Sequence, residues 1–341
     1  MAASDVRPAD TLIIDRLLNR GFDAAETTRI ANAVLESPMP EAYVSARVLE
    51  RAKLAKIAAS LPPGVEQRTP EWYAARDQIV SASDFYQAAF GTDAAKRAFV
   101  AKKAGTAAPF LGNDATRWGV KYEDVAKLLY EKVMGTHVVE HGLLMHPTEA
   151  IVGASPDGIT SYCNIEIKNP ASKVLADVPN EYFAQMQGQM EVCGINCCDF
   201  VVCRQKEFPD APEFWDKFAS AFDLGYGHDR YGAVGSKQRE DSDALTFVYS
   251  DPGMSPDELR EWTAGHPDYS FTLHHVFDFR ITRVNRDGDY IAKMIVGLKE
   301  TWARVLEARA NPKALASAKR SAGNDYVEPP TLRGFSFRQP R

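Results

Sequence analysis

Apolar residues recur at helical spacing in several stretches of the chain, and shorter runs that alternate apolar and polar residues lie between them. Spacings of three and four residues indicate helices with one buried face, whereas alternation indicates strands. The clearest helical stretch is 115–134, which is followed by Gly135, a residue typical of helix ends. Its apolar stripe consists of Trp118, Tyr122, Val125, Leu129 and Val133.

The same patterns predict a succession of further elements after residue 69. Helices are expected at 70–78, 83–90, 96–103, 180–192 and 290–309, and strands at 137–145, 150–154, 164–168, 199–204 and 271–284. Ser255 and Glu258 also have the spacing of a capping box, which predicts a helix start there. Helices that lead into a strand meander, followed by a helix and a further strand, predict an α/β domain with a mixed sheet.

Three segments differ in composition from this domain. Residues 1–66 have the pattern of short helices and are expected to form a helical N-terminal extension, which docks on the body or on a partner, or grips DNA. Residues 205–270 are rich in Asp, Pro, Gly and Ser and are expected to be an insertion. Residues 312–341 are expected to form a loosely attached tail. The main domain therefore covers 67–311.

Composition restricts the class of protein. The 341 residues are 45% hydrophobic and 25% charged, which is ordinary for a globular protein. A net charge of -6 argues against a general nucleic-acid coat protein, but it is compatible with an enzyme that focuses positive charge in one cleft. No apolar run approaches the ~20 residues that span a membrane. The start of the chain lacks a secretory signal, so we expect an intracellular protein with five reduced cysteines.

The stretch "SPDGITSYCNIEIKNP", residues 155–170, contains the strongest chemical signal. Alternation along a strand puts Glu166 and Lys168 on one face, and the turn at Asp157 lets this carboxylate lie beside Glu166. Two such carboxylates repel each other unless a cation neutralises them, and Mg²⁺ takes one or two carboxylates plus substrate phosphates. A neighbouring lysine can hold water or stabilise phosphoryl charge. From these residues alone, a solvent-facing hairpin with a weak surface ion pair is the alternative.

Two helical residues add to this signal. Gln187 lies on or beside the apolar face of the helix expected at 180–192, where its amide needs hydrogen-bonding partners that a polar cleft would supply. Glu123 lies at the edge of the stripe of 115–134, and an ordinary exposed acid is the alternative for it.

Four blocks in order resemble the YqaJ-type viral recombinase nucleases, typified by the phage lambda exonuclease, within the PD-(D/E)XK nuclease superfamily. The blocks are "EWYAARDQIVSASDF", "RWGVKYEDVA", "GASPDG…IEIKNP" and "YFAQMQGQM". The resemblance covers roughly 69–204 and 272–308. It implies a restriction-endonuclease-like core with a central mixed β-sheet flanked by helices, to which the N-terminal extension and the insertion are added.

The resemblance also implies a site for two Mg²⁺ or Mn²⁺ ions. Asp157 would bind both ions, Glu166 and the carbonyl of Ile167 would complete one site, and Glu123 would bind the second ion.

Further roles follow from the same resemblance. Lys168 would orient and activate the attacking water, and Gln187 would position the nucleophile or Lys168. Arg76 and Ser83 would bind a terminal 5′-phosphate, for which a guanidinium and a hydroxyl are suited. Arg117 would contact the DNA backbone. Without the resemblance, a surface arginine and a helix-capping serine are the simpler interpretations of Arg76 and Ser83.

The implied activity is metal-dependent degradation of linear double-stranded DNA from 5′ to 3′, which leaves 3′ single strands for recombination or repair. An endonuclease or flap-trimming nuclease of the same fold is the alternative enzyme, and a non-catalytic DNA-end-binding scaffold is the alternative of another class. Implied partners are duplex DNA ends, a single-strand annealing protein and further copies of the chain, although the insertion and the N-terminal extension could obstruct a lambda-type ring trimer. A phage or virus is the expected source.

Four cysteines lie within 193–203, but their spacing differs from the iron–sulfur pattern of some of these nucleases, which favours buried thiols.

Overall fold

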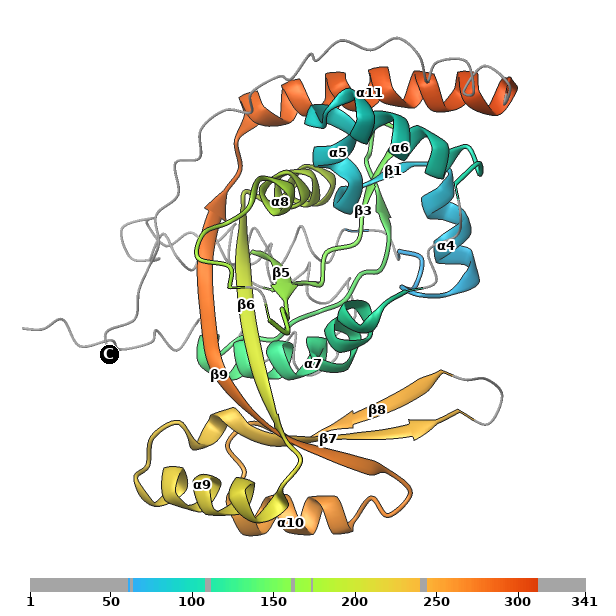
Figure 1. The fold of residues 1–341 in the computed structure, drawn as a ribbon. Helices are drawn as coiled ribbons and strands as arrows, with labels where there is room; N and C mark the ends of the chain where they lie inside the picture. Colours follow the sequence, from blue (N-terminus) through green and yellow to red (C-terminus); the bar gives the residue numbers. More distant parts are fainter. Residues whose placement is uncertain are drawn as a thin grey trace, which may run out of the picture.

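The computed structural model describes residues 61, 64–107, 112–160, 163–172, 174–239 and 244–311 (Figure 1). The helices expected within 1–60 and the tail expected from residue 312 lie outside these ranges. Helices and strands alternate along the described chain around a mixed sheet, so the expected α/β class is confirmed. Across the described helices, none has the length and apolarity needed to span a membrane.

The elements follow one another in an order close to that expected from the sequence. The helices are α4 (Pro70–Asp77), η1 (Ala82–Asp84), α5 (Phe85–Phe90), α6 (Asp93–Lys103), α7 (Asp114–Met134), α8 (Asn180–Cys193), α9 (Ala211–Asp223), η2 (His228–Arg230), α10 (Pro256–Ala264) and α11 (Gly288–Ala310). The strands are β1 (Val80–Ser81), β2 (Leu144–Met145), β3 (Val152–Ala154), β4 (Gly158–Ile159), β5 (Asn164–Lys168), β6 (Cys197–Phe208), β7 (Tyr231–Gln238), β8 (Leu245–Tyr249) and β9 (Ser270–Asn285).

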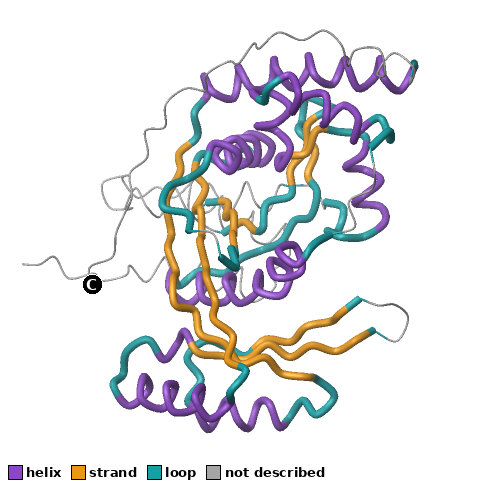
Figure 2. Tube along the Cα trace, viewed as in Figure 1, coloured by secondary structure: helices purple, strands orange, loops and turns teal. Residues whose placement is uncertain are grey.

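A six-stranded sheet connects the two parts of the molecule. Its strand order is β4-β5-β6-β9-β7-β8, in which β5 and β6 are parallel and the other neighbours are antiparallel. Strands β6 and β9 are long and run from the helix-flanked upper body into a lower lobe (Figures 1 and 2). A smaller sheet of order β1-β3-β2 lies within the upper body.

Helices cover both faces of the sheet in the upper body. On one face, Leu129 of α7 belongs to a core cluster with Ile167 of β5. On the opposite face, Met190 of α8 packs in a cluster with Phe200 of β6. Because strand side chains alternate between faces, the odd-numbered residues of β5 face α7, and Glu166 and Lys168 face α8.

Small residues allow the helices above the sheet to approach closely. A methyl group added at Gly188 of α8 would lie 1.9 Å from the ring of Phe85 in α5. A methyl group added at Gly297 of α11 would lie 2.8 Å from the backbone of Ala89. These contacts fix α8 and α11 against α5, and therefore fix the helix that faces the polar side of β5.

The expected insertion forms a lobe with its own core. The lobe consists of the distal ends of β6 and β9 with α9, β7, β8 and α10, and its core cluster contains Phe208, Phe214, Phe218, Ala233 and Leu259. The capping box at Ser255 and Glu258 is present at the start of α10, as expected. Lys132 of α7 donates to the carbonyl of Pro252 at 3.0 Å, which ties the lobe to the upper body.

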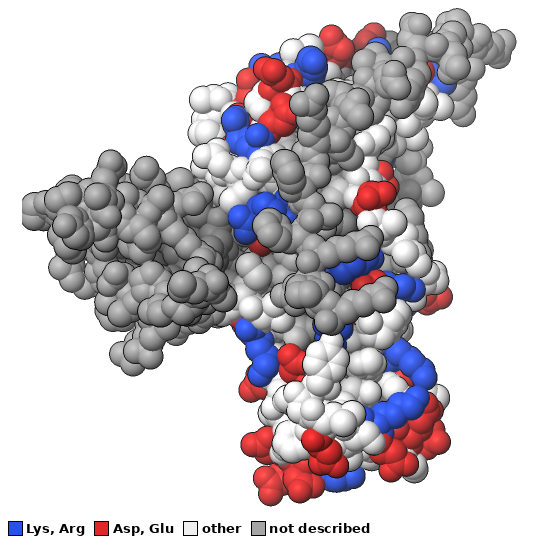
Figure 3. Space-filling view, turned by 90° about the vertical axis from the view of Figure 1, so that its left-hand side faces the viewer, with Lys and Arg blue, Asp and Glu red and all other residues white. Residues whose placement is uncertain are grey.

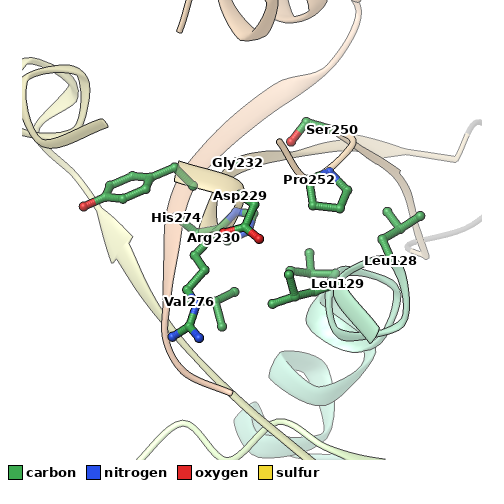
Figure 4. A pocket seen from close by; sticks show the side chains of 11 residues that line it. Leu128, Leu129, Asp229, Arg230, Gly232, Ser250, Pro252, His274 and Val276 are labelled. Atoms are coloured by element: carbon green, nitrogen blue, oxygen red, sulfur yellow. The ribbon is translucent and has the colours of Figure 1, made fainter. Parts of the chain in front are cut away.

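A small cavity lies where the lobe meets α7 (Figure 4). Leu128 and Leu129 line it from α7, and Ser250, His274 and Val276 line it from the lobe. Its volume of about 20 Å³ leaves room for about one water molecule.

Three expectations about the elements were wrong in detail. The strand expected at 137–145 is limited to β2, because Val139 and Leu143 form only isolated bridges. Val133 is 40% exposed, because the buried stripe of α7 runs through Tyr130 instead. Strand β6 continues beyond residue 204 to Phe208, since it also pairs with β9 inside the lobe.

Candidate active site

Asp157 lies directly between β3 and β4 and reaches across to β5. Its carboxylate accepts the backbone N–H of Ile167 at 2.6 Å. The N–H and C=O of one strand residue point to the same edge of the strand, so the carbonyl of Ile167 faces the same side as Asp157. The pairing of Gly158 with Ile165 holds this turn against β5. The structure thus brings Asp157 and Ile167 together.

Glu166 is fully buried between two polar side chains. One carboxylate oxygen accepts a hydrogen bond from the ammonium of Lys168, and the other accepts the side-chain amide of Gln189 in α8 at 2.6 Å. The ammonium of Lys168 also lies 4.7 Å from the centre of the Tyr182 ring. The acid and the base at alternate positions of β5 therefore form a buried pair beneath α8.

Electrostatic coupling shows that the acids share one environment. Burial raises the pKa of Asp157 well above its ordinary value, and the nearby carboxylates of Glu166 and Glu123 raise it further. Burial alone would lower the pKa of Lys168, but Glu166 and Asp157 outweigh it and raise that pKa above its ordinary value. Glu166 and Glu123 thus both act on Asp157, and Glu166 and Asp157 both act on the ammonium of Lys168.

Glu123 reaches this region from α7 and has a cationic partner. Its carboxylate accepts a hydrogen bond from Arg68 at 2.5 Å. Burial raises the pKa of Glu123, whereas Arg68 and Lys127 lower it. Arg68 has a backbone φ of 67°, in the left-handed region that few non-glycine residues adopt. This contact was not expected from the sequence, because it joins residues 55 positions apart.

The donor set fits a hard divalent cation. Glu166 and Glu123 both raise the pKa of Asp157, and a cation between these carboxylates would relieve their repulsion. Carboxylate and carbonyl oxygens are the ligands that Mg²⁺ prefers. The buried side-chain oxygen of Gln189 has no hydrogen-bonding partner in the described structure, so it can accept from a water molecule. In this structure Glu166 pairs with Lys168 and Glu123 pairs with Arg68, and among the described residues no three His, Cys, Asp or Glu side chains form a ready-made metal cluster.

A second polar cluster lies beside Asp157. Arg76 donates to the hydroxyl of Ser83 at 2.9 Å, and its guanidinium lies 4.2 Å from the centre of the Trp72 ring. The indole N–H of Trp72 donates to the hydroxyl of Ser155 at 3.0 Å, two residues before Asp157. The structure therefore brings Arg76 and Ser83 together, and Trp72 links them to the turn that carries Asp157.

Two lysines of α6 add positive charge to this cluster. The ammonium of Lys103 donates to the backbone carbonyl of Arg76 at 2.6 Å, and Lys102 pairs with Asp84 at 3.0 Å. Burial lowers the pKa of Lys103 to about 8, and the attraction of Asp84 only partly opposes this effect. Burial likewise lowers the pKa of Arg76.

Two residues that were expected at the site, Gln187 and Arg117, make their contacts with other parts of the protein. The amide of Gln187 donates to the carbonyl of Asn285 at 2.8 Å and accepts the N–H of Asp287 at 2.7 Å, so it joins α8 to the turn between β9 and α11. Neither contact reaches Lys168, and the expectation that Gln187 positions the nucleophile or Lys168 stays a prediction. Gln189 is the amide that contacts Glu166. Arg117 lies at the exposed start of α7, where it pairs with Asp114.

Residues 71–196 match the family described as YqaJ-like viral recombinase domain. This part of the chain is similar to the YqaJ-like viral recombinase domain. The matched residues include nearly all of α4 and the whole of β5 and α8, and therefore all residues of the acidic site and of the Arg76 cluster except Arg68.

The chain is also similar to a viral protein and to solved bacterial structures. Uncharacterized protein R354 of Acanthamoeba polyphaga mimivirus is 31% identical over 178 residues, which cover 46% of this chain and 32% of that protein. The match thus spans about a third of that relative's length. An alkaline exonuclease (LHK-Exo) from Laribacter hongkongensis has a TM-score of 0.45 at 24% identity, over 73% of this chain and 99% of that one. A phage related exonuclease from Haemophilus somnus 129PT has a TM-score of 0.39 at 15% identity, over 69% and 96%.

Proposed function

We propose that the chain is a metal-dependent deoxyribonuclease that degrades linear double-stranded DNA from its 5′ ends and leaves 3′ single strands. The observation that carries this proposal is the buried group of Asp157, Glu166 and Lys168 within a YqaJ-like viral recombinase domain. A family of recombinases needs single strands for annealing, and a nuclease that trims one strand from an end supplies them. We also propose that the protein acts in a virus-infected cell, since a mimivirus protein is a relative.

The residues of the site divide into those that hold ions and those that act on water and phosphate. Asp157, Glu166, Glu123 and the carbonyl of Ile167 would hold two Mg²⁺ or Mn²⁺ ions. When bound, these ions would supply Lewis acidity for the attacking water and for the leaving 3′-oxygen. Lys168 presents an ammonium that orients the water and stabilises negative charge on the phosphoryl oxygens.

Gln189 would take the positioning role in this mechanism. Its N–H group fixes the Glu166 carboxylate at 2.6 Å, and its unpartnered oxygen can accept a hydrogen bond from the attacking water. An amide that contacts both a carboxylate and the nucleophile sets the direction of attack.

The Arg76 cluster would bind the phosphate at the 5′ end. A guanidinium and a hydroxyl 2.9 Å apart can both donate to a phosphate, and two lysines of α6 add attraction nearby. Because Trp72 links this cluster to Ser155 and thus to the turn of Asp157, the terminal phosphate and the scissile one would lie close together. Such a pocket favours removal of nucleotides from an end over cleavage within a strand.

Digestion of end-labelled linear duplex tests this proposal. The protein is incubated with DNA labelled at either the 5′ or the 3′ end, with Mg²⁺ or with EDTA, and with closed circular DNA as a control. We expect release of the 5′ label only with Mg²⁺, and 3′ single strands as the remaining product. Preferential release of the 3′ label, or cutting of circles at the same rate, would contradict a 5′ exonuclease.

A further inference from the structure

The face of the sheet between α8 and α9 carries two cations, of which Arg204 is largely buried and Lys206 is exposed. On β6, Phe200 and Val202 pack in the cluster beneath α8, and Phe208 packs in the cluster beneath α9. Arg204 and Lys206 lie between these positions and on the same face, because strand side chains alternate. The side chain of Lys206 is 54% exposed. Strand β6 therefore presents two cations in the gap between the two helices.

This exposed face begins beside the candidate active site. In the parallel register of β5 and β6, Glu166 is paired with Phe200 and Lys168 with Val202. Paired residues point to the same face of a sheet, so Glu166 and Lys168 share the face of Arg204. A DNA strand that extends from Lys168 along β6 would next reach Arg204.

Two further cations border the same gap. Arg280 of β9 is paired with Val202, and Lys217 of α9 lies 5.6 Å from the centre of the Phe208 ring. We name Arg204, Lys206, Lys217 and Arg280 the cationic track. Two carboxylates pair with its members: Asp278 with Arg204 and Arg280, and Glu213 with Lys206 and Lys217. The track thus has an excess of positive charge in a chain of net charge -6. Figure 3 shows Lys and Arg side chains on the lower part of the molecule, above a lower end that is rich in Asp and Glu.

Aromatic rings lie along the cationic track. His275 is paired with Lys206, and its ring stacks on Tyr231 at 4.3 Å, which in turn stacks on Phe218 at 5.2 Å. Phe277 is 45% exposed and lies 4.8 Å from the guanidinium of Arg204. Burial lowers the pKa of His275 to about 4, and nearby cations, of which Arg230 has the largest effect, contribute to this shift. The His275 ring is therefore neutral at pH 7.

We propose that the cationic track, with His275 and Phe277, binds the single-stranded DNA that the active site produces. The proposal rests on the proposed nuclease function for the source of that strand. Sites for single-stranded nucleic acid combine cations that follow the backbone with aromatic rings on which bases stack. Both elements are present on one face, beside Lys168, and the rings suit unpaired bases, which a duplex does not offer.

Fluorescence anisotropy tests the contribution of the charges. A labelled oligothymidylate of about 20 nucleotides, longer than a typical single-strand site, is titrated with the full chain in EDTA so that it is not cleaved. The double substitution Lys206→Gln and Lys217→Gln should weaken binding about tenfold and reduce the dependence of log Kd on log salt by about 1.4, as expected for two lost phosphate contacts. Lys299→Gln is the matched control, because this lysine lies on distant α11, its side chain is 52% exposed and it pairs with Glu149.

A second variant tests the aromatic part. Phe277→Ala should weaken single-strand binding about fivefold and leave the salt dependence unchanged, since stacking involves no phosphate. Unchanged binding in both variants would overturn the proposal, as would an equal loss of affinity for a duplex of the same length, which indicates a general polyanion surface. If the wild type fails to cleave duplex with Mg²⁺ while the variants lose single-strand binding, the track is supported and the proposed nuclease function is contradicted.

Discussion

Lys168 and Arg76 are cations of neighbouring clusters, but their partners differ. Lys168 is bonded to the buried carboxylate of Glu166, where the scissile phosphate would lie. Arg76 donates a hydrogen bond to Ser83 and lies over the ring of Trp72, on the side of the site where the 5′ end of a DNA strand would lie. Their substitution should therefore separate chemistry from end recognition.

Lys168→Ala should abolish cleavage of both phosphorylated and hydroxyl 5′ ends while DNA binding remains, because a contact made mainly in the transition state is removed. Arg76→Ala should retain cleavage but lose most of the preference for phosphorylated ends. Both variants are compared with the wild type on the same pair of duplexes. A phosphate preference that survives Arg76→Ala would place the phosphate pocket elsewhere.

Lys103 has a buried ammonium whose pKa of about 8 makes stability depend on pH. Below pH 8 this lysine is charged in the folded and the unfolded chain, and the folded chain bears the full cost of burying the charge. As pH rises above 8, the folded chain loses its proton first, so the unfolded chain binds more protons and stability rises. Between pH 7 and 9.5, urea unfolding should show the wild type gaining about 2 kcal/mol relative to Lys103→Met. A constant difference between the two proteins would show that Lys103 is not desolvated.

Residues whose contacts depend on local geometry could be placed from the sequence. Asp157 lies in a turn, and Glu166 and Lys168 occupy alternate positions of one strand, so their proximity could be predicted from spacing. Gln189 could not be separated from Gln187 because both are buried in α8, where residues 186–190 are buried on every side and periodicity gives no direction. Arg68 was missed because its contact with Glu123 depends on the tertiary fold.

Helix α9 could be recognised from the spacing of its phenylalanines in the sequence. Phe214, Phe218 and Phe222 recur at spacings of four, a helical signal inside a segment that was interpreted as an insertion from its Asp, Pro and Gly content. The strand expected at 137–145 had strand-like residues, but its segment finds a partner strand only at β2. Composition predicts an insertion in this segment, whereas the pairing of its strands depends on β6 and β9.

Gly188 gives a prediction about the packing of α8 on α5. Gly188→Ala should destabilise the protein by about 1–3 kcal/mol, because the new methyl group overlaps the ring of Phe85. Gly119→Ala in α7 is the control: a methyl group there meets no atom within 4 Å, and it should stabilise the helix by about 0.5–1 kcal/mol. Both free energies of unfolding come from urea titrations. A destabilised Gly119→Ala, or a neutral Gly188→Ala, would contradict this packing.

For the whole molecule, the continuous strands β6 and β9 are the main mechanical link. They pair from Cys197 to Phe208 without interruption apart from one irregularity at Arg204 and Gln205. The core of the lobe and the core of the upper body are therefore built on the same two strands, and we expect them to unfold together.

Phe218→Ala should lower the stability of the entire protein by about 3–5 kcal/mol in one transition, because a fully buried ring of the lobe is removed. Tryptophan fluorescence reports on both parts, since Trp215 and Trp262 lie in the lobe and Trp302 lies in α11. Phe222→Ala, on the same helix but 40% exposed, should have a small effect. Two separate transitions in Phe218→Ala would show that the lobe unfolds independently.

The pairing of Arg204 with Asp278 also makes the lobe removable. These residues face each other on antiparallel neighbours, the geometry that a two-residue hairpin connects. A shortened chain in which Asn-Gly replaces residues 205–277 should therefore close the sheet and retain Mg²⁺-dependent cleavage, as measured on end-labelled duplex, while it loses Lys206, Lys217 and His275. A chain that aggregates would show that α7 depends on the lobe to cover Leu128. A lobe that enters and leaves through one pair of facing residues could have been gained in a single step, by lengthening an existing hairpin.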